Sequence, residues 1–379
     1  MIAAGYAPAR AAPAGRRVLI IGAGLSGLVA GYELDKKGYD VTILEAQSRP
    51  GGRVLTLRQF DEGLYSDAGA ARIPRDHDLT LRYVSEFSLS LLPFYPTENK
   101  FVRVRNDRVE QVDWGKFKDA TSMVMPLRNP EFWQKIKGGN DLLPHAFASK
   151  LKAKVLYDSP VVKITQNPKE VVLSFDDKGR RQSIAGEFLV CAIPFTTLRN
   201  IETLPAFSPP KTEAIRSMEY DSASRVFIEI KRRFWEDQGL NGFGFGDDAA
   251  EVWHSSFGQP ATHGILQTYL RGRYSIDLTN QAERDRVNST VAKLTRLFPD
   301  LQPNYIRGVA KCWSEDPWVK GAWARTEDDG AVGKSREGRV FFAGEHLSDH
   351  GSWMQGALES GLRVVNEIVS VPAATAAVA

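Results

Sequence analysis

Cysteine and histidine are scarce in this chain of 379 residues, which contains two cysteines and six histidines. Cys191 and Cys312 lie far apart and are flanked by strand-forming residues. We therefore interpret them as small buried side chains in a reducing compartment, which predicts a cytoplasmic protein. The histidines show no HExxH or other paired spacing, so the sequence predicts no metal site.

Long apolar runs and an excess of one charge are also missing. No run approaches the roughly 20 apolar residues that a membrane-spanning helix needs. The net charge is +3, and basic and acidic residues are interspersed along the chain. We therefore expect neither a membrane nor a nucleic acid as a partner. Residues 1–15 and 371–379 are rich in small residues and are expected to be flexible tails.

A strand, a glycine motif and a helix follow the first tail. Residues 17–21 are typical of a buried parallel strand, apolar residues at helical spacing begin at Leu25, and a second strand at 41–45 ends in Glu45. Glycines in the connecting loop permit a tight turn, close approach of a pyrophosphate and close helix packing, and Glu45 is placed to accept ribose hydroxyls. The pattern predicts a dinucleotide site, whereas a purely structural glycine turn leaves Glu45 unexplained. The motif consists of Gly22, Ala23, Gly24, Leu25, Ser26 and Gly27.

The middle of the chain is rich in short strands, expected near 101–104, 161–164, 171–175, 187–193 and 224–230. Helices are expected over 131–151, with a break at 138–139, and over 280–298. A last strand at 339–344 leads into a helix beginning near Trp353, which repeats the pattern of the N-terminus. We infer a cofactor domain built from 16–66, 137–210 and 312–370, and an inserted substrate domain built from 67–136 and 211–311.

A second glycine-rich stretch, RPGGRVLT at 49–56, supplies two glycines for close backbone approach and two arginines, Arg49 and Arg53, for phosphate oxygens. It matches the RxGGRxxT signature of the flavin amine oxidases. Three further stretches resemble the L-amino-acid oxidases of that superfamily, and the resemblance covers nearly the whole chain. These stretches lie at 218–236, 342–346 and 353–361.

The resemblance implies an α/β fold with a Rossmann-like FAD-binding domain made of discontinuous segments. The inserted α+β substrate domain would contain a mostly antiparallel sheet, and FAD would be bound non-covalently, since Ala322 stands near the place of a flavin-linked cysteine in some relatives. A homodimer is also expected. The residues expected to bind the cofactor are Gly22, Gly24, Ser26, Gly27, Glu45, Ala46, Gly52, Arg53, Gly69, Ala70, Ala71, Arg72, Val162, Gly344, Glu345, Trp353, Met354 and Ala357.

Arg72 stands in the small, apolar run DAGAARIP at 67–74, which resembles the segment that carries the substrate-carboxylate arginine of L-amino-acid oxidases. A planar guanidinium can give a carboxylate two parallel hydrogen bonds. The alternative for Arg72 is a salt bridge to Asp67 or Asp76. The resemblance also implies that Tyr269 donates to the same carboxylate, although it could equally be an ordinary strand tyrosine, and that Trp353 walls the pocket.

Two departures from the family pattern affect the expected chemistry. Arg225 occupies the place of the flavin-facing lysine that assists reaction with oxygen, so the electron acceptor could be O2 or another compound. The stretch between Arg72 and Gly138 is too short for a full helical entry domain, which predicts a less enclosed pocket.

The expected activity is oxidative deamination of an L-α-amino acid by oxidase or dehydrogenase chemistry. The alternatives are a monoamine or polyamine oxidase and a non-catalytic protein with a flavin-binding fold. The side-chain preference stays open. Acidic residues at Asp247, Asp248 and Glu251 raise arginine or lysine as substrates, whereas the tryptophans favour bulky apolar side chains.

Overall fold

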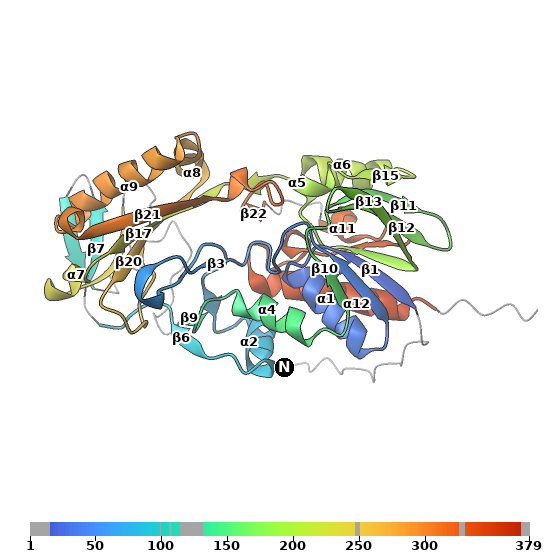
Figure 1. Ribbon diagram of the computed structural model, residues 1–379, viewed down its shortest axis with the longest axis horizontal. Helices are drawn as coiled ribbons and strands as arrows, with labels where there is room; N and C mark the ends of the chain where they lie inside the picture. The colour runs from blue at the N-terminus through green and yellow to red at the C-terminus, as the bar shows by residue number, and fades with distance from the viewer. Residues whose placement is uncertain are drawn as a thin grey trace, which may run out of the picture.

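The computed structural model describes residues 16–98, 100–105, 108–113, 132–246, 251–325 and 330–372. The tail expected at 1–15 and residues 373–379 of the second tail lie outside these ranges. The chain forms two lobes, with β17, β20 and β21 in one and β1, α1 and α12 in the other (Figure 1). Within the described ranges, no helix combines the length and the apolar character that crossing a membrane requires.

A five-stranded parallel sheet forms the centre of the first lobe, in the order β10-β2-β1-β14-β23. Successive residues of β1 point to opposite faces: Val18 and Ile20 pack with the helices, whereas Leu19 and Ile21 pack with the small sheet on the other side. The two helices on the first face are α1 (Leu25–Lys36) and α12 (Met354–Ser370). The strands are β1 (Arg17–Ile21), β2 (Asp40–Leu44), β10 (Lys154–Leu156), β14 (Phe188–Cys191) and β23 (Val340–Phe342).

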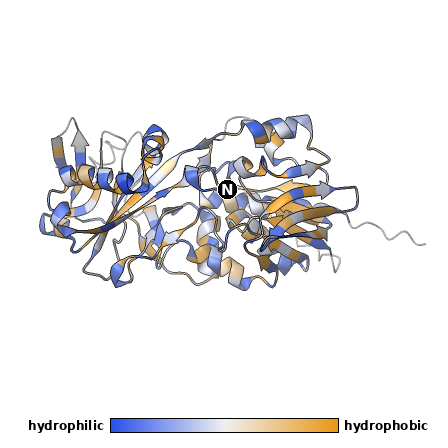
Figure 2. Cartoon of the chain, turned by 45° about the horizontal axis from the view of Figure 1, so that its top comes forward, coloured by the Kyte–Doolittle hydropathy of each residue, from blue (hydrophilic) through white to orange (hydrophobic). Residues whose placement is uncertain are grey.

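The opposite face of the parallel sheet is covered by a four-stranded sheet in the order β13-β12-β11-β15 and by short helices. Figure 2 shows that hydrophobic residues concentrate in the strands of this lobe. The elements are β11 (Val161–Gln166), β12 (Val171–Asp177), β13 (Arg180–Gly186), β15 (Glu202–Leu204), α5 (Phe195–Leu198), α6 (Pro209–Ser217) and α11 (Gly330–Lys334).

The second lobe contains a seven-stranded sheet in the order β21-β17-β20-β19-β18-β7-β8. All neighbouring pairs are antiparallel except β18 and β7. This confirms the expected mostly antiparallel sheet. The strands are β7 (Lys100–Arg105), β8 (Arg108–Val112), β17 (Ala223–Ile230), β18 (Leu240–Phe245), β19 (Glu251–His254), β20 (Gly264–Arg271) and β21 (Tyr305–Cys312). The helices are α7 (Phe234–Asp237), α8 (Gly272–Thr279), α9 (Glu283–Leu297) and α10 (Leu301–Asn304).

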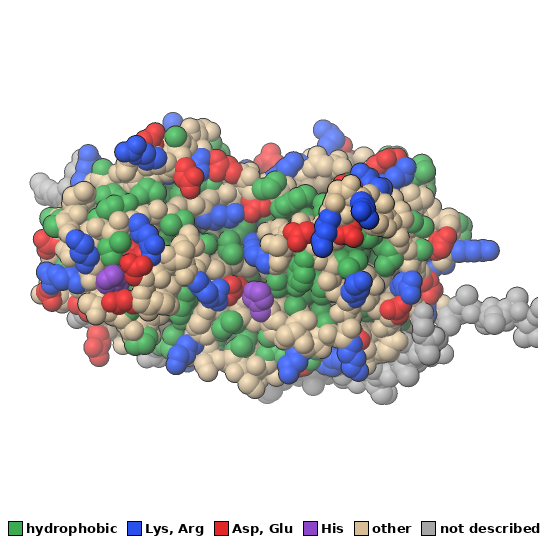
Figure 3. Space-filling model, viewed as in Figure 1, with side chains coloured by type: hydrophobic (Ala, Val, Ile, Leu, Met, Phe, Trp, Pro, Cys, Tyr) green, Lys and Arg blue, Asp and Glu red, His purple; other side chains and the backbone are tan. Residues whose placement is uncertain are grey.

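Short elements connect the lobes. One prediction is wrong here: residues 133–136 form β9 rather than a helix, because they pair with β5 and β6, and the helix α4 starts only after Gly138 and Gly139. On the face that Figure 3 shows, basic and acidic side chains of the described residues are interspersed. The short elements that connect the lobes are β3 (Thr56–Leu57), β4 (Ser66–Asp67), β5 (Ile73–Pro74), α2 (Asp78–Glu86), β6 (Leu91–Pro93), β9 (Trp133–Ile136), α4 (Leu142–Lys150), β16 (Tyr220–Asp221) and β22 (Trp323–Ala324).

Candidate active site

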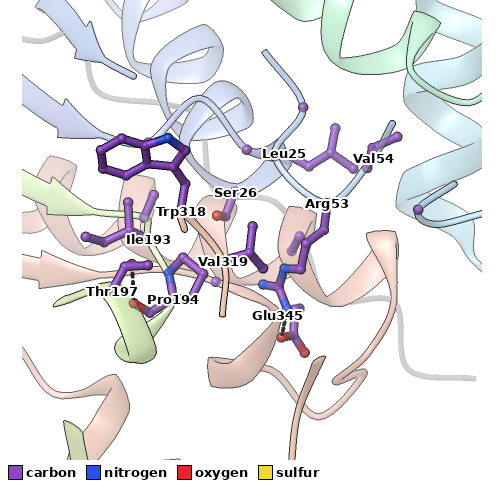
Figure 4. Close-up of a pocket in the computed structure, with 18 of the residues that line it drawn as sticks. Leu25, Ser26, Arg53, Val54, Ile193, Pro194, Thr197, Trp318, Val319 and Glu345 are labelled. Atoms are coloured by element: carbon purple, nitrogen blue, oxygen red, sulfur yellow. Dashed lines mark hydrogen bonds and ion pairs between the residues drawn. The ribbon is translucent and has the colours of Figure 1, made fainter. Parts of the chain in front are cut away.

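A cavity of about 760 Å³ lies between the two lobes and is lined by residues of both sheets. The structure brings together at this cavity every residue that the sequence analysis named for catalysis or cofactor binding except Gly27 and Arg49. Figure 4 shows part of the lining, with Ser26 from the first helix, Arg53 and Glu345 in contact, and Trp318 beside Ile193. Residues separated by more than 300 positions in the sequence therefore share one site.

The first glycine motif leaves room beside the N-terminus of α1. Gly22 has a φ of +98°, which favours glycine. A Cβ atom on Gly24 would meet no protein atom within 4 Å, so its surroundings are open to a ligand. A Cβ on Gly27 would lie 2.0 Å from the carbonyl oxygen of Gly22, so Gly27 permits helix packing rather than ligand contact. Leu25 and Ser26, in the first turn of α1, line the cavity.

Glu45 lies just after β2 at the edge of this cavity, where parallel strands end. Its carboxylate accepts hydrogen bonds from the amides of Ala23, at 2.7 Å, and Gln47, at 2.9 Å. Burial raises the pKa of Glu45 above its ordinary value, and these amide bonds oppose that effect. The position fits a carboxylate that accepts the hydroxyls of a ribose, while Val162 of β11 lines the same end of the cavity.

The two arginines of the second glycine-rich stretch have different roles. Arg53 pairs with Glu345 at 2.6 Å and lines the cavity. Although burial disfavours the carboxylate, Arg53 lowers the pKa of Glu345 below its ordinary value. The expectation for Arg49 is wrong, because its guanidinium donates to the carbonyls of Pro50 and Gly52 and does not line the cavity. Arg49 therefore stabilises the loop without lining the cavity.

The C-terminal helix begins at the same cavity. Met354 is its first residue, and Trp353, Met354 and Ala357 line the cavity. His346 is buried, and neither of its ring nitrogens has a hydrogen-bond partner among the described residues. Burial lowers the pKa of His346 to about 4, so the ring is neutral near pH 7.

The unpartnered ring nitrogens of His346, the open space at Gly24 and the carboxylate of Glu45 fit a large polar ligand such as FAD. The chain's cysteines, Cys191 and Cys312, are buried and free, and neither lines the cavity. A thioether link to a flavin therefore has no donor here.

Arg72 lies at the other end of the cavity, between the rings of Trp133 and Trp253, whose centroids are 5.3 and 5.0 Å from its guanidinium carbon. It donates to the hydroxyl of Tyr95 at 3.2 Å, and it lies 3.6 Å from Glu251. Although burial acts against the charge, Tyr95 and Glu251 raise the pKa of Arg72 above its ordinary value. The guanidinium is held in place but keeps donors for a ligand.

Glu251 is the acid that faces Arg72, rather than the two aspartates considered from the sequence. Asp67 instead accepts hydrogen bonds from Thr56 and the amide of Asn140. The carboxylate of Glu251 also lies 3.4 Å from Arg271 and accepts from the indole of Trp253 at 2.9 Å. Two guanidinium groups and an indole N–H therefore surround Glu251, which does not line the cavity itself, although its Oε1 accepts no hydrogen bond from a described residue. The other acids considered with it, Asp247 and Asp248, lie outside the described residues.

Arg225 of β17 is buried and lines the same end. One of its nitrogens donates to the carbonyl of Asp67 at 2.6 Å, and its guanidinium carbon lies 4.9 and 4.6 Å from the ring centroids of Trp253 and Tyr269. Burial, together with the charge of Arg72, lowers the pKa of Arg225 below its ordinary value. The guanidinium nevertheless remains charged, since no physiological pH removes its proton.

Aromatic rings close the sides of this end. Tyr269 is buried, and its hydroxyl has no hydrogen-bond partner within the part of the chain that the structure describes. Trp353 lies nearly parallel to Trp133, with centroids 6.1 Å apart, and its edge meets His77. Tyr269 and Trp353 line the cavity here.

The sequence analysis did not find Arg271, Tyr95 or Trp253. A signal existed for Arg271, because it stands two residues after Tyr269 in one strand and therefore points to the same face. Tyr95 lies in an irregular segment, and Trp253 reaches the site only through the pairing of β19 with β20. No local pattern marks these two.

Comparison with known proteins gives a consistent result. A family model described as flavin-containing amine oxidoreductase matches residues 25–129 and 112–369. The chain is 30% identical to a putative L-amino-acid oxidase, YobN, of Bacillus subtilis (strain 168), over 94% of this chain and 95% of that protein. It is 26% identical to the flavin-dependent L-tryptophan oxidase RebO of Lentzea aerocolonigenes, over 93% and 98%.

Among solved structures, the chain resembles a wild-type putrescine oxidase bound to putrescine, with a TM-score of 0.81 and 18% identity over 94% of this chain and 99% of the other. The cyclohexylamine oxidase from Brevibacterium oxydans IH-35A gives a TM-score of 0.81 and 17% identity over 93% and 98%. At these identities the likeness shows the fold alone.

Proposed function

Because this chain belongs to the flavin-containing amine oxidoreductase family, we propose that it deaminates an L-α-amino acid oxidatively to the 2-oxo acid and ammonia. Membership of the family itself shows that the protein is a flavoprotein oxidoreductase that acts on amines and uses FAD. The choice of an amino acid over a simple amine rests on the site.

Arg72 is the observation that carries this choice. A buried guanidinium at a cavity wall is expensive unless an anion meets it. Glu251 lies 3.6 Å from Arg72 but is shared with Arg271, and a simple amine offers no further anion. Trp133 and Trp253, together with Tyr95 and Glu251, hold the arginine in place, while the phenol of Tyr269 offers a further donor at the same end. An α-carboxylate matches this set, because it accepts two parallel bonds from a guanidinium and a third from a phenol.

The chain's residues would orient the substrate for the reaction. Arg72 and Tyr269 would hold the carboxylate, and backbone carbonyls near Ser352 would accept from the amine. Ser352 has a φ of +70°, a conformation unusual for a side-chain-bearing residue, and its amide donates to Glu345 at 2.7 Å. Trp353 would exclude water from the reacting face. Orientation of this kind accounts for much of the rate that a protein can contribute.

FAD, when bound, supplies the acceptor for the hydride that leaves Cα. The substrate amine must be neutral at that moment, because its lone pair forms the C=N bond as the C–H bond breaks. Water then hydrolyses the imino acid to the 2-oxo acid and ammonia. The two electrons pass to O2, giving hydrogen peroxide, or to another acceptor. Because Arg225 cannot release a proton, the identity of the electron acceptor is tested separately. The measurement is the amount of hydrogen peroxide formed per 2-oxo acid.

We also propose the two-domain division inferred from the sequence and a reducing, cytoplasmic setting. The division is supported by the separate sheets of the two lobes. The setting is supported by Cys191 and Cys312, which are both free and buried.

Substitution of the arginine tests the proposal. Arg72→Met should lower kcat/KM for amino acids by about 100-fold or more, because a charged hydrogen bond to the carboxylate is lost. Turnover of the corresponding decarboxylated amines should change little. The matched control is Arg232→Met, since Arg232 is exposed in the same lobe and pairs only with Asp237 among the described residues. Unchanged amino-acid kinetics in Arg72→Met, in a protein that keeps its flavin, would contradict the proposal.

A further inference from the structure

The substrate end of the cavity has more cations than acids. Three guanidinium groups line it, those of Arg72, Arg225 and Arg271. Among the described residues, one carboxylate, that of Glu251, lies within ion-pairing distance of two of them, Arg72 and Arg271. Burying a cation without a counter-charge costs free energy, and a bound anion offsets that cost.

The pairing of strands places these groups in one row. Arg225 of β17 stands opposite Tyr269 of β20, and Tyr269 stands opposite Glu251 of β19. Directly opposed residues point to the same face of a sheet, and Arg271, two residues beyond Tyr269, shares that face. One carboxylate oxygen of Glu251 lies 3.6 Å from Arg72 and the other lies 3.4 Å from Arg271, so these two cations share one negative charge.

Arg225 is the cation without an acid. It is 7% exposed, and no described carboxylate lies within ion-pairing distance of it. Its guanidinium donates to the carbonyl of Asp67 and lies against the rings of Trp253 and Tyr269. A guanidinium has several N–H donors, and one carbonyl leaves most of those of Arg225 for the cavity. The guanidinium of Arg271 has no hydrogen bond to any described residue, and Arg271 is partly exposed at the cavity wall.

From this arrangement we infer that the substrate carries a second acidic group in its side chain, as L-aspartate and L-glutamate do. The inference rests on the proposed function, in which Arg72 and Tyr269 receive the α-carboxylate. The side-chain carboxylate then binds to Arg225, with Arg271 as a second donor. With the amine neutral, such a substrate brings two negative charges, and the three arginines and Glu251 carry two net positive charges.

The other side-chain classes fit less well. An arginine or lysine side chain would bring a cation into a region that already has a surplus, and Glu251 is engaged by Arg72, Arg271 and Trp253. An apolar side chain would leave Arg225 buried without an anion and would displace water from its donors. The aromatic rings of this end do not require an apolar substrate, because Trp253 and Tyr269 already stack on arginines.

The first experiment compares substrates that differ only in charge. The holoenzyme is mixed anaerobically with L-glutamate or L-glutamine, and with L-aspartate or L-asparagine, and bleaching of the flavin is followed. The acidic member of each pair should give a kcat/KM for flavin reduction higher by about 100-fold, since a site built for a polar partner rejects an analogue that lacks it. Equal or faster reduction by the neutral members would overturn the inference.

Variants then locate the second acid-binding group. Arg225→Gln should reduce the preference for L-glutamate over L-glutamine to within about 5-fold, measured as the ratio of the two kcat/KM values in the same variant. Arg271→Gln, at the partly exposed position, should lower the preference by about 10-fold and serves if the buried variant does not fold. Arg232→Gln is the control that leaves the preference unchanged. A preference that survives both cavity variants contradicts the assignment.

A binding measurement separates this inference from the proposed function. Glutarate and butyrate are titrated into the holoenzyme, and the flavin absorbance is followed without turnover. The dicarboxylate should bind at least about 10-fold more tightly, and Arg225→Gln should abolish the difference. If glutarate binds in this way but no amino acid reduces the flavin, the proposed function fails and the acid site stands. If amino acids reduce the flavin but glutarate shows no advantage, the acid site fails alone.

Discussion

The two ends of the cavity hold their ligands by different means. At the cofactor end, glycines present backbone and open space, Arg53 is matched by Glu345, and Glu45 is held by backbone amides. At the substrate end, side chains dominate, and arginines outnumber the described acids that face them. Figure 4 shows the first arrangement, with Arg53 and Glu345 in contact below the first turn of α1.

This difference shows how one cavity can bind both a cofactor that stays in place and a substrate that enters and leaves. A resident cofactor can be bound by fixed backbone geometry, because its shape does not change between catalytic cycles. A substrate that enters and leaves can instead supply the charge that the empty site lacks, so its binding is selective for that charge. In the proposed function, the first end would select the cofactor and the second would select the substrate.

The largest effect is expected from breaking the matched pair at the cofactor end. Arg53→Met should lower the free energy of unfolding by about 3 kcal/mol, because Glu345 stays buried without its cation. Urea denaturation measures the change. In the double variant Arg53→Met with Glu345→Gln, part of this stability should return. A double variant as unstable as the single one would show that the pair is not matched as described.

A smaller effect should separate the two glycines of the first motif. Gly27→Ala should destabilise the protein by about 1–3 kcal/mol, because its Cβ would lie 2.0 Å from the carbonyl oxygen of Gly22. Gly24→Ala should leave the stability of the flavin-free protein unchanged and lower its FAD content, since its Cβ meets open space. Thermal unfolding of the apoprotein and the absorbance of bound flavin provide the two readouts. Equal effects of both variants on the apoprotein would contradict this division of roles.

The pH dependence sharpens the description of the substrate end. Below the pKa of the substrate amine, kcat/KM should rise about tenfold per pH unit, because the fraction of neutral amine rises by that factor. The arginines do not titrate in this range, and burial lowers the pKa of His77, beside Trp353, to about 4.

His77→Gln should therefore leave the position of the pH profile unchanged between about pH 6 and 9. Initial rates over this range, measured with saturating acceptor, check the expectation. A profile that moves with the variant would place a titrating group of the protein in the reaction.

The smallest effect is expected from the first arginine of the RPGGRVLT stretch. Arg49→Gln should cost about 1 kcal/mol of stability, because its bonds to the carbonyls of Pro50 and Gly52 brace the loop without reaching the cavity. Flavin content should be retained. A loss of flavin at unchanged stability would instead place Arg49 on a phosphate.

Much of the fold could be predicted from local patterns. The strand at 17–21, the helix that follows it and the last strand and helix all appear where their periodicity indicated. The error at β9 has a physical cause. Residues 133–136 have no strong preference of their own, and pairing with β5 and β6 decides their conformation.

The candidate site was predictable where chemistry and position are both local. Gly22 and Gly24 can be assigned from neighbouring residues, since steric limits act within a few positions of the chain. Arg49 and Arg53 could not be told apart in the same way. Each is an arginine beside a glycine pair, and only the packing of Glu345 against one of them separates their roles.

The sequence by itself therefore determined the family and the cofactor and predicted which loops are expected to bind it, because glycine positions and strand–helix order depend on adjacent residues. Only the tertiary structure decided the electrostatic character of the substrate end. Arg72, Arg225, Glu251 and Arg271 come from four separate segments, and their charges become a common property only when burial brings them together in a region of low dielectric constant.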